Sequence, residues 1–194
     1  MVLDQLGGQL ATSTLPWNKA VYEHTRDAGG PGRSTVVNFG LKTNPEYAAF
    51  ANATFGKDFE MEDFNSECMA HPGCVAIPAT LAVAEELRVS GKDYILSVVV
   101  GCEVILRFGL AAGRSMMLDR GFHVVSVQGP LGAAAGIGRL FGLGEDQFLN
   151  AISIAGSHAS GTIEYGQTGG DVKRLNAGIA ASGGVRSALL ARRG

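Results

Sequence analysis

The sequence contains little charge, few aromatic side chains and no cluster of basic residues. Of its 194 residues, 18% are charged and 7% are aromatic, and the formal net charge is -2. Its 16 lysines and arginines are scattered along the chain, which argues against nucleic-acid binding because that function needs a concentrated basic surface. The hydrophobic fraction of 46% is enough to bury one sizeable core, so the chain is not disordered.

Cysteine is also scarce. The three cysteines, Cys68, Cys74 and Cys102, form neither a CxxC pair nor an even-numbered set, so we expect free thiols in a reduced, intracellular protein. Together with His71 they lack the spacing of a zinc or iron–sulfur site, and we predict no metal. The run at 136–138 lacks the spacing and the preceding strand of a dinucleotide-binding fingerprint, so we predict no cofactor.

The chain lacks a secretory signal and a convincing membrane span. Its start carries Asp4 and has neither a basic segment nor a long apolar run, as though it were cut from something longer. The most apolar stretch, Ile95 to Ala112, is interrupted by Glu103 and Arg107, which can pair on one helix face. We therefore predict a helix buried in protein, no membrane partner, and a cytoplasmic location, or a mitochondrial one if the source is eukaryotic.

Most of the sequence has the pattern of α-helices. Apolar residues recur at helical spacing, and the 28 glycines and many alanines indicate narrow helices that pack closely. We predict one all-α, helical-bundle domain over residues 1–194. The expected helices span residues 2–11, 16–27, 45–55, 77–89, 92–112, 126–141, 145–154 and 172–193, with a short extended piece at 34–39 and a loop at 163–171.

A few polar residues interrupt apolar or glycine-rich segments. They are the acidic run 60–63, His71, His123, His158 and the Asp-Val-Lys-Arg run at 171–174. An acidic run is usually a solvated face, and a lone histidine is more often a hydrogen-bonded structural residue than a catalyst. Spacing along the chain does not show which of these residues meet.

Five segments in a fixed order carry a resemblance to a known family. They are FEMEDFNSECMAHPGCVAIPATLAVAEEL at 59–87, GCEVILRFGLA at 101–111, RGFHVVSVQGPLGAAAGIGRLFGL at 120–143, NAISIAGSHASG at 150–161, and GGDVKRLNAGIAASGGVRSALLARRG at 169–194. In their order and in their residue sequences they resemble the MmgE/PrpD family, which includes 2-methylcitrate dehydratase and cis-aconitate decarboxylase. The resemblance extends over essentially the whole chain.

The resemblance implies a large helical domain with a smaller α/β lid domain, usually assembled as a homodimer. The chain would then be an incomplete N-terminal helical domain, with the lid domain absent. Helix faces that pack on missing segments would expose apolar area, so we expect a homodimer or other self-association.

The resemblance also assigns roles to individual residues. The histidine of the GFH segment is His123, the basic residue of the DVKRL segment is Lys173, and the HP histidine is His71; with Asp63 these are the predicted catalytic residues. Three further residues are predicted to bind substrate: Glu60, Arg174 and His158.

The chain departs from the family pattern at four of its polar positions. Asn65 and Asn176 stand where the family commonly has histidines, Glu60 where many members have aspartate, and His158 where the family often has glutamine. These departures leave the specific reaction open.

The reactions of the family require residues of these types in one site. Loss of water from a small di- or tricarboxylate needs one base and one acid, and histidine suits either task. A lysine can bind a substrate carboxylate and stabilise developing negative charge. The sequence therefore predicts a cofactor-independent lyase that acts on small polycarboxylates, of the 2-methylcitrate dehydratase type. The alternatives are a decarboxylase of the cis-aconitate type and a truncated, non-catalytic helical module that retains only a dimerisation surface.

Overall fold

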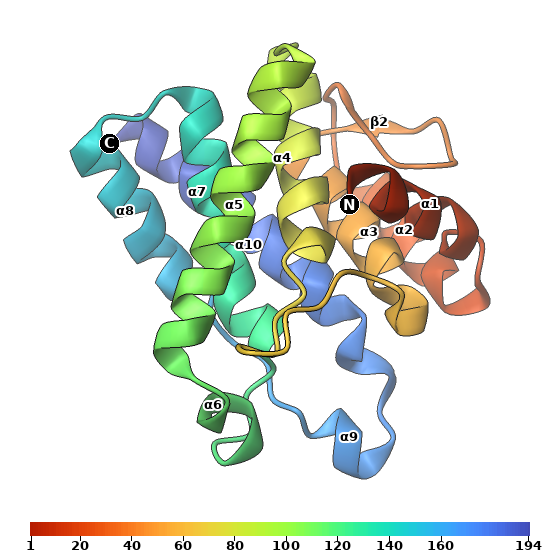
Figure 1. Cartoon of the computed structure of the whole chain (residues 1–194). Helices are drawn as coiled ribbons and strands as arrows, with labels where there is room; N and C mark the ends of the chain where they lie inside the picture. Colours follow the sequence, from red (N-terminus) through yellow and green to blue (C-terminus); the bar gives the residue numbers. More distant parts are fainter.

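The computed structural model describes all residues, Met1–Gly194, and confirms the mainly helical prediction (Figure 1). The helices are α1 (Val2–Thr12), α2 (Pro16–Ala28), α3 (Pro45–Lys57), α4 (Gly73–Leu87), α5 (Gly91–Ala112), α6 (Ser115–Leu118), α7 (Val124–Phe141), α8 (Glu145–Gly156), α9 (Tyr165–Thr168) and α10 (Leu175–Arg193). Two 3₁₀ turns, η1 (Asp58–Glu60) and η2 (Asp171–Lys173), precede the loop before α4 and the start of α10.

Several element boundaries differ from the predicted ones. The extended piece at 34–39 is shorter: β1 (Ser34–Thr35) pairs antiparallel with β2 (Lys42–Thr43), a partner that the sequence did not indicate. The short helix α9 lies in the segment 163–171, which was predicted as a loop, and the short helix α6 lies between two predicted helices. The helix α4 begins at Gly73, before the predicted start at 77, because the Asp63 carboxylate accepts a hydrogen bond from its N–H at 2.9 Å.

Glycine allows the central helices to approach closely, as the composition predicted. A methyl group on Gly132 of α7 would lie 2.5 Å from the Gly101 carbonyl oxygen of α5, and one on Gly136 would lie 2.7 Å from the Ser97 carbonyl oxygen. On the opposite side of α7, a methyl group on Gly184 of α10 would lie 2.8 Å from the Pro130 carbonyl oxygen. Because no side chain fits at these positions, α7 lies directly against both neighbours.

The helix α5 is only partly buried, which corrects the sequence prediction. One face, which includes Val98 and Ile105, packs on the bundle, while Ile95, Val99 and Leu110 are more than half exposed. By length and composition alone, α5 could cross a membrane, but a third of its most apolar window is buried in the bundle and its exposed surface carries the Glu103–Arg107 ion pair that the sequence predicted. Next to it, an apolar groove is lined by Val104, Phe108, Leu143, Phe148, Leu149 and Ile152.

The loops that matter for function gather at one end of the bundle, with α6 and α9 (Figure 1). The His123 N–H donates to the Gly161 carbonyl at 3.0 Å, so the start of α7 is fixed by the loop that follows α8. The Arg114 guanidinium, just before α6, donates to the Ser66 carbonyl at 2.8 Å. Segments that are distant in the sequence therefore meet where α3 ends and where α4, α7 and α10 begin.

The close contact between α5 and α7 can be tested by adding one methyl group. Gly132→Ala should lower the free energy of unfolding by about 1–3 kcal/mol, because the new methyl group meets backbone that cannot move aside. Gly7→Ala is the matched control, since Gly7 lies in α1 with nothing near its missing side chain; it should be neutral or stabilising by up to about 1 kcal/mol. Urea denaturation measures both, and equal effects would contradict the close contact.

Self-association remains a prediction, and the exposed apolar surface of α5 and α8 gives it a location. Sedimentation at micromolar concentration should show a species larger than a monomer. Val99→Glu and Leu149→Glu should shift the chain toward the monomer, whereas Lys19→Glu, on exposed α2, should not. A monomer in the unmodified chain would contradict the prediction.

Candidate active site

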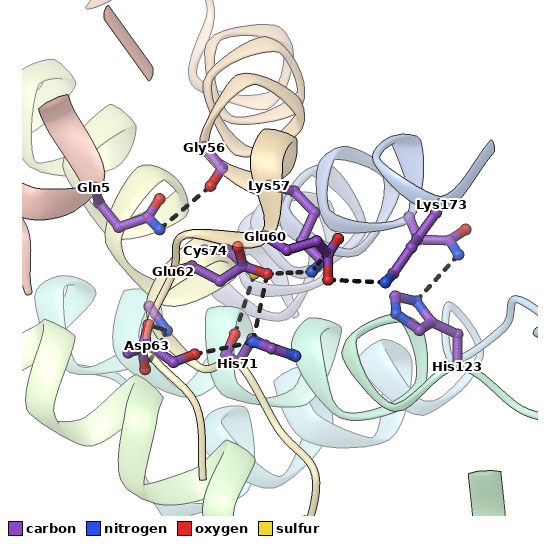
Figure 2. A network of polar contacts seen from close by, with 12 residues as sticks. Gln5, Gly56, Lys57, Glu60, Glu62, Asp63, His71, Cys74, His123 and Lys173 are labelled. Carbon is purple, nitrogen blue, oxygen red and sulfur yellow. Dashed lines mark hydrogen bonds and ion pairs between the residues drawn. The ribbon is translucent and has the colours of Figure 1, made fainter. Parts of the chain in front are cut away.

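The site is built around the end of α3. Lys57 is the last residue of α3, and the chain then turns sharply because Phe59 and Glu60 both adopt positive φ, at 63° and 54°. Such values are uncommon for residues with side chains and need support from their surroundings. The turn brings two carboxylates back over the helix end: the Lys57 ammonium donates to Glu60 Oε1 at 3.0 Å and to Glu62 Oε1 (Figure 2).

His71 lies against this cluster in a defined orientation. Its Nδ1 is 3.0 Å from the Asp63 carbonyl oxygen and 3.4 Å from Glu62 Oε1. Both neighbours are acceptors, so Nδ1 carries the proton and donates to the carbonyl. The neutral ring then has an unprotonated Nε2, which can accept a proton from a substrate.

His123 has the opposite arrangement of its proton. It precedes α7, and its Nδ1 receives a hydrogen bond from Asn176 Nδ2 at 3.1 Å and lies 3.2 Å from Ser126 Oγ. Because an amide nitrogen only donates, Nδ1 is the acceptor and the proton of the neutral ring is on Nε2. His123 is thus prepared to donate a hydrogen bond or a proton, where His71 is prepared to accept one.

Lys173 reaches the same cluster from the other side. It ends η2, and its Nζ donates to Glu60 Oε2 at 2.8 Å. The Lys173 ammonium also lies 5.9 Å from the centre of the Tyr165 ring, whose face meets the His123 ring edge-on at 5.6 Å. Lys173 and Glu60 are both partly exposed, so an anion from solvent can reach this ammonium.

The electrostatics of the cluster keep both imidazoles neutral. Burial, and then the positive charge of Lys57, lower the pKa of His71 to about 4 and that of His123 to about 3. For Glu60, partial burial would raise the carboxyl pKa, but the ion pairs with Lys173 and Lys57 outweigh it and lower the pKa. Near neutral pH the site therefore holds two uncharged histidines beside an exposed ammonium.

Four of the seven predicted site residues meet in this cluster: His71, His123, Lys173 and Glu60 (Figure 2). A positive charge on His71 would oppose one on His123, and this contributes to the low pKa of His123. Figure 2 shows the two rings facing the space below Glu60 and Lys173 from opposite sides. Sequence spacing could not have brought them together.

The structure places the other three predicted residues elsewhere. The Asp63 side chain accepts hydrogen bonds from the Gly73 N–H at 2.9 and 3.2 Å, and only the Asp63 carbonyl contacts His71. The Arg174 guanidinium turns away from the cluster: it pairs with Asp58 at 3.1 Å. His158 follows α8 and packs beside Gly183 of α10, with no hydrogen bond to the cluster.

Sequence reasoning missed three residues of this site. Lys57 and Glu62 have fully buried side chains, whereas the pattern of the acidic run favours an exposed face and the predicted helix 45–55 ends before Lys57. Asn176 was noted only as a departure from the family pattern, yet it orients His123. The only local signal was a lysine at a helix end directly followed by acidic residues. In contrast, Asn65 accepts hydrogen bonds from the backbone of its own loop and holds no site group.

One geometric arrangement resembles a metal site. Single ligand atoms of Glu60, Glu62 and His71 lie within 4.8 Å of one another. However, the Lys57 ammonium already donates to both carboxylates, so a cation of this chain occupies the position that a metal would need. The residues fit an internal ion-pair network better than a metal centre.

Comparisons with known proteins match the chain along its whole length. A sequence model described as the MmgE/PrpD N-terminal domain matches residues 1–194. The cis-aconitate decarboxylase of Aspergillus terreus is 34% identical over 199 residues, which cover 100% of this chain and 40% of that protein. The cis-aconitate decarboxylases of Homo sapiens and Mus musculus are each 32% identical over 200 residues, which cover 100% of this chain and 41% and 40% of those proteins.

These relatives are carboxy-lyases, so the chain is related to a group of lyases. It belongs to the MmgE/PrpD family, which confirms the resemblance seen in the sequence. The chain spans about two fifths of the length of the curated relatives it matches.

The role of the Asp63 side chain can be separated from that of its carbonyl. Asp63→Ala should lower the free energy of unfolding by about 1 kcal/mol, because α4 loses the acceptor at its first N–H. Asp63→Asn keeps an oxygen at that position and should remain close to the unmodified chain. Urea denaturation measures both. If Asp63→Ala has no effect, the carboxylate does not hold the start of α4.

Proposed function

We propose that this chain supplies the proton-transfer residues of a lyase that acts on small polycarboxylates without a cofactor, and that its reaction is decarboxylation of a substrate of the cis-aconitate type. The observation that carries the proposal is the pairing of two neutral histidines with opposite proton positions beside an exposed lysine. The relatives named as cis-aconitate decarboxylases support the choice of reaction.

The residues divide the reaction between them. Lys173 attracts a carboxylate of the substrate, and Glu60 holds the ammonium in position until the substrate arrives. When the carbon–carbon bond to the departing carboxylate breaks, its electron pair spreads through the double bond toward a remaining carboxylate, and CO₂ leaves. The Lys173 charge stabilises that anion. His123 donates its Nε2 proton to carbon, and solvent replaces it.

Dehydration of a hydroxy acid of the 2-methylcitrate type is the second candidate. It has its own support, because this reaction needs a base and an acid together. His71 would remove the proton next to a carboxylate through Nε2, and His123 would protonate the departing hydroxyl. The dehydratase prediction made from the sequence stays a prediction.

A non-catalytic helical module remains the third candidate, from a different class. It was motivated by the two asparagines at positions where the family commonly has histidines. In the structure Asn176 orients His123 and Asn65 holds its own loop, and His71, His123 and Lys173 still meet in one cluster. This observation favours the catalytic proposal.

The reaction is tested by offering the chain, and any longer natural protein that contains it, cis-aconitate and 2-methylcitrate separately. Decarboxylation predicts CO₂ release from cis-aconitate, whereas dehydration predicts a new ultraviolet absorption from 2-methylcitrate. His123→Gln should lower the rate by about 10²- to 10⁴-fold. His158→Gln is the control and should leave the rate unchanged. No product from either acid would favour the non-catalytic module.

A further inference from the structure

Lys57 is the most deeply buried charge near the site and has no role in the steps above. Its side chain is completely buried, as is that of its partner Glu62. Removing an ammonium and a carboxylate from water costs several kcal/mol for each ion, and their attraction often fails to offset that cost. A buried pair at this position is therefore weak evidence for stability and calls for another explanation.

The pair is the centre of a chain of alternating charges. Lys173 Nζ donates to Glu60 Oε2 at 2.8 Å, and Glu60 Oε1 accepts from Lys57 at 3.0 Å. Lys57 also donates to Glu62 Oε1, which is 3.4 Å from His71 Nδ1. The two ends of this chain are the substrate-facing ammonium and the ring prepared to act as a base (Figure 2). The Lys57 and Glu62 side chains touch no solvent, whereas Glu60 is partly exposed.

We infer that Lys57 is a positioning residue: its buried ammonium holds Glu60 and Glu62 in place between Lys173 and His71, and its charge opposes further positive charge on the histidine rings of the cluster. The inference rests on the proposed function for its catalytic meaning, but the arrangement itself can be measured without a substrate. An ordinary structural pair would only attach the loop after α3 to the helix end. It would not set the protonation of rings on two other segments.

The effect of Lys57 on the pKa of each histidine depends on the other charges near that ring. His71 faces positive charge from Lys57 and Lys173, and negative charge from Glu60 and Glu62. The Asp63 carbonyl stabilises its protonated form. Burial lowers the pKa of His71 most, followed by the Lys57 charge.

The His123 ring has fewer compensating groups. Lys57, Lys173 and a protonated His71 all oppose its charge, Glu60 alone favours it, and the Tyr165 ring packs on its edge. After burial, Lys57 is again the largest contributor to its low pKa. Loss of the Lys57 charge should therefore raise the proton affinity of both rings. The sign is fixed: a nearby positive charge favours the neutral imidazole.

The test is a histidine titration by NMR of the unmodified chain and of Lys57→Met. In the unmodified chain, the His71 and His123 signals should stay in the neutral form from about pH 8 down to about pH 5. In Lys57→Met, both should titrate at a pH higher by about one unit or more, a tenfold change in proton affinity. Lys57→Arg keeps the charge and should restore the original behaviour. Lys19→Met, on exposed α2, is the control for a lost positive charge elsewhere.

A second variant covers the case in which Lys57→Met does not fold. Lys57→Met with Glu62→Gln removes both members of the buried pair, so no carboxylate is left without its partner. His123 should still titrate at a higher pH in this variant, because it faces Lys57 and not Glu62. If the folded variants keep the original titration of both rings, Lys57 is only structural and the inference is overturned.

The kinetic consequence separates the two proposals. Where dehydration is observed, the acidic limit of the pH–rate profile should move upward by about one unit in Lys57→Met, because His71, the base of that reaction, is protonated at a higher pH. A shifted titration with no activity toward either acid would support the role of Lys57 and reject the proposed reaction. Activity with an unshifted titration would support the proposed reaction and reject the role of Lys57.

Discussion

The close approach of α5, α7 and α10 is the constraint on which the site depends. It is possible only because glycine occupies the contact positions, where a methyl group would meet a neighbouring backbone. The helix α7 begins directly after His123, and α10 begins directly after the segment that carries Lys173. The relative position of these two helices thus sets the distance between the His123 ring and the Lys173 ammonium.

The polar cluster lies at one end of these packed helices and depends on charge pairing rather than on close backbone contact. Its charges alternate along a line, so no buried ion lacks a partner of opposite sign. The histidines stay uncharged because they lie where burial and positive charge act together. Their opposite proton positions come from neighbours of opposite kind, a carbonyl for His71 and an amide N–H for His123. Fixed neighbours of this kind set which nitrogen of each neutral ring carries the proton.

Most of the helical fold could be predicted from the sequence because caps and apolar periodicity are local signals. The start of α4 could not, since its first N–H is satisfied by Asp63 from the preceding loop. The site also depends on contacts between segments that are distant in the sequence. Family motifs identified His71, His123 and Lys173, but Lys57 and Glu62 looked like surface residues because burial depends on a turn at Phe59 that no spacing reveals.

The contacts of Arg174 connect the helix α2 to the segment that carries Lys173. Arg174 directly follows Lys173, lies 4.6 Å from the Trp17 ring centre and pairs with Asp58, which also accepts hydrogen bonds from Trp17 and Asn18 of α2. The helix α2 thereby anchors the segment that carries the Lys173 ammonium. Sequence variation in α2 can thus change how far the Lys173 side chain extends toward the histidines of the cluster.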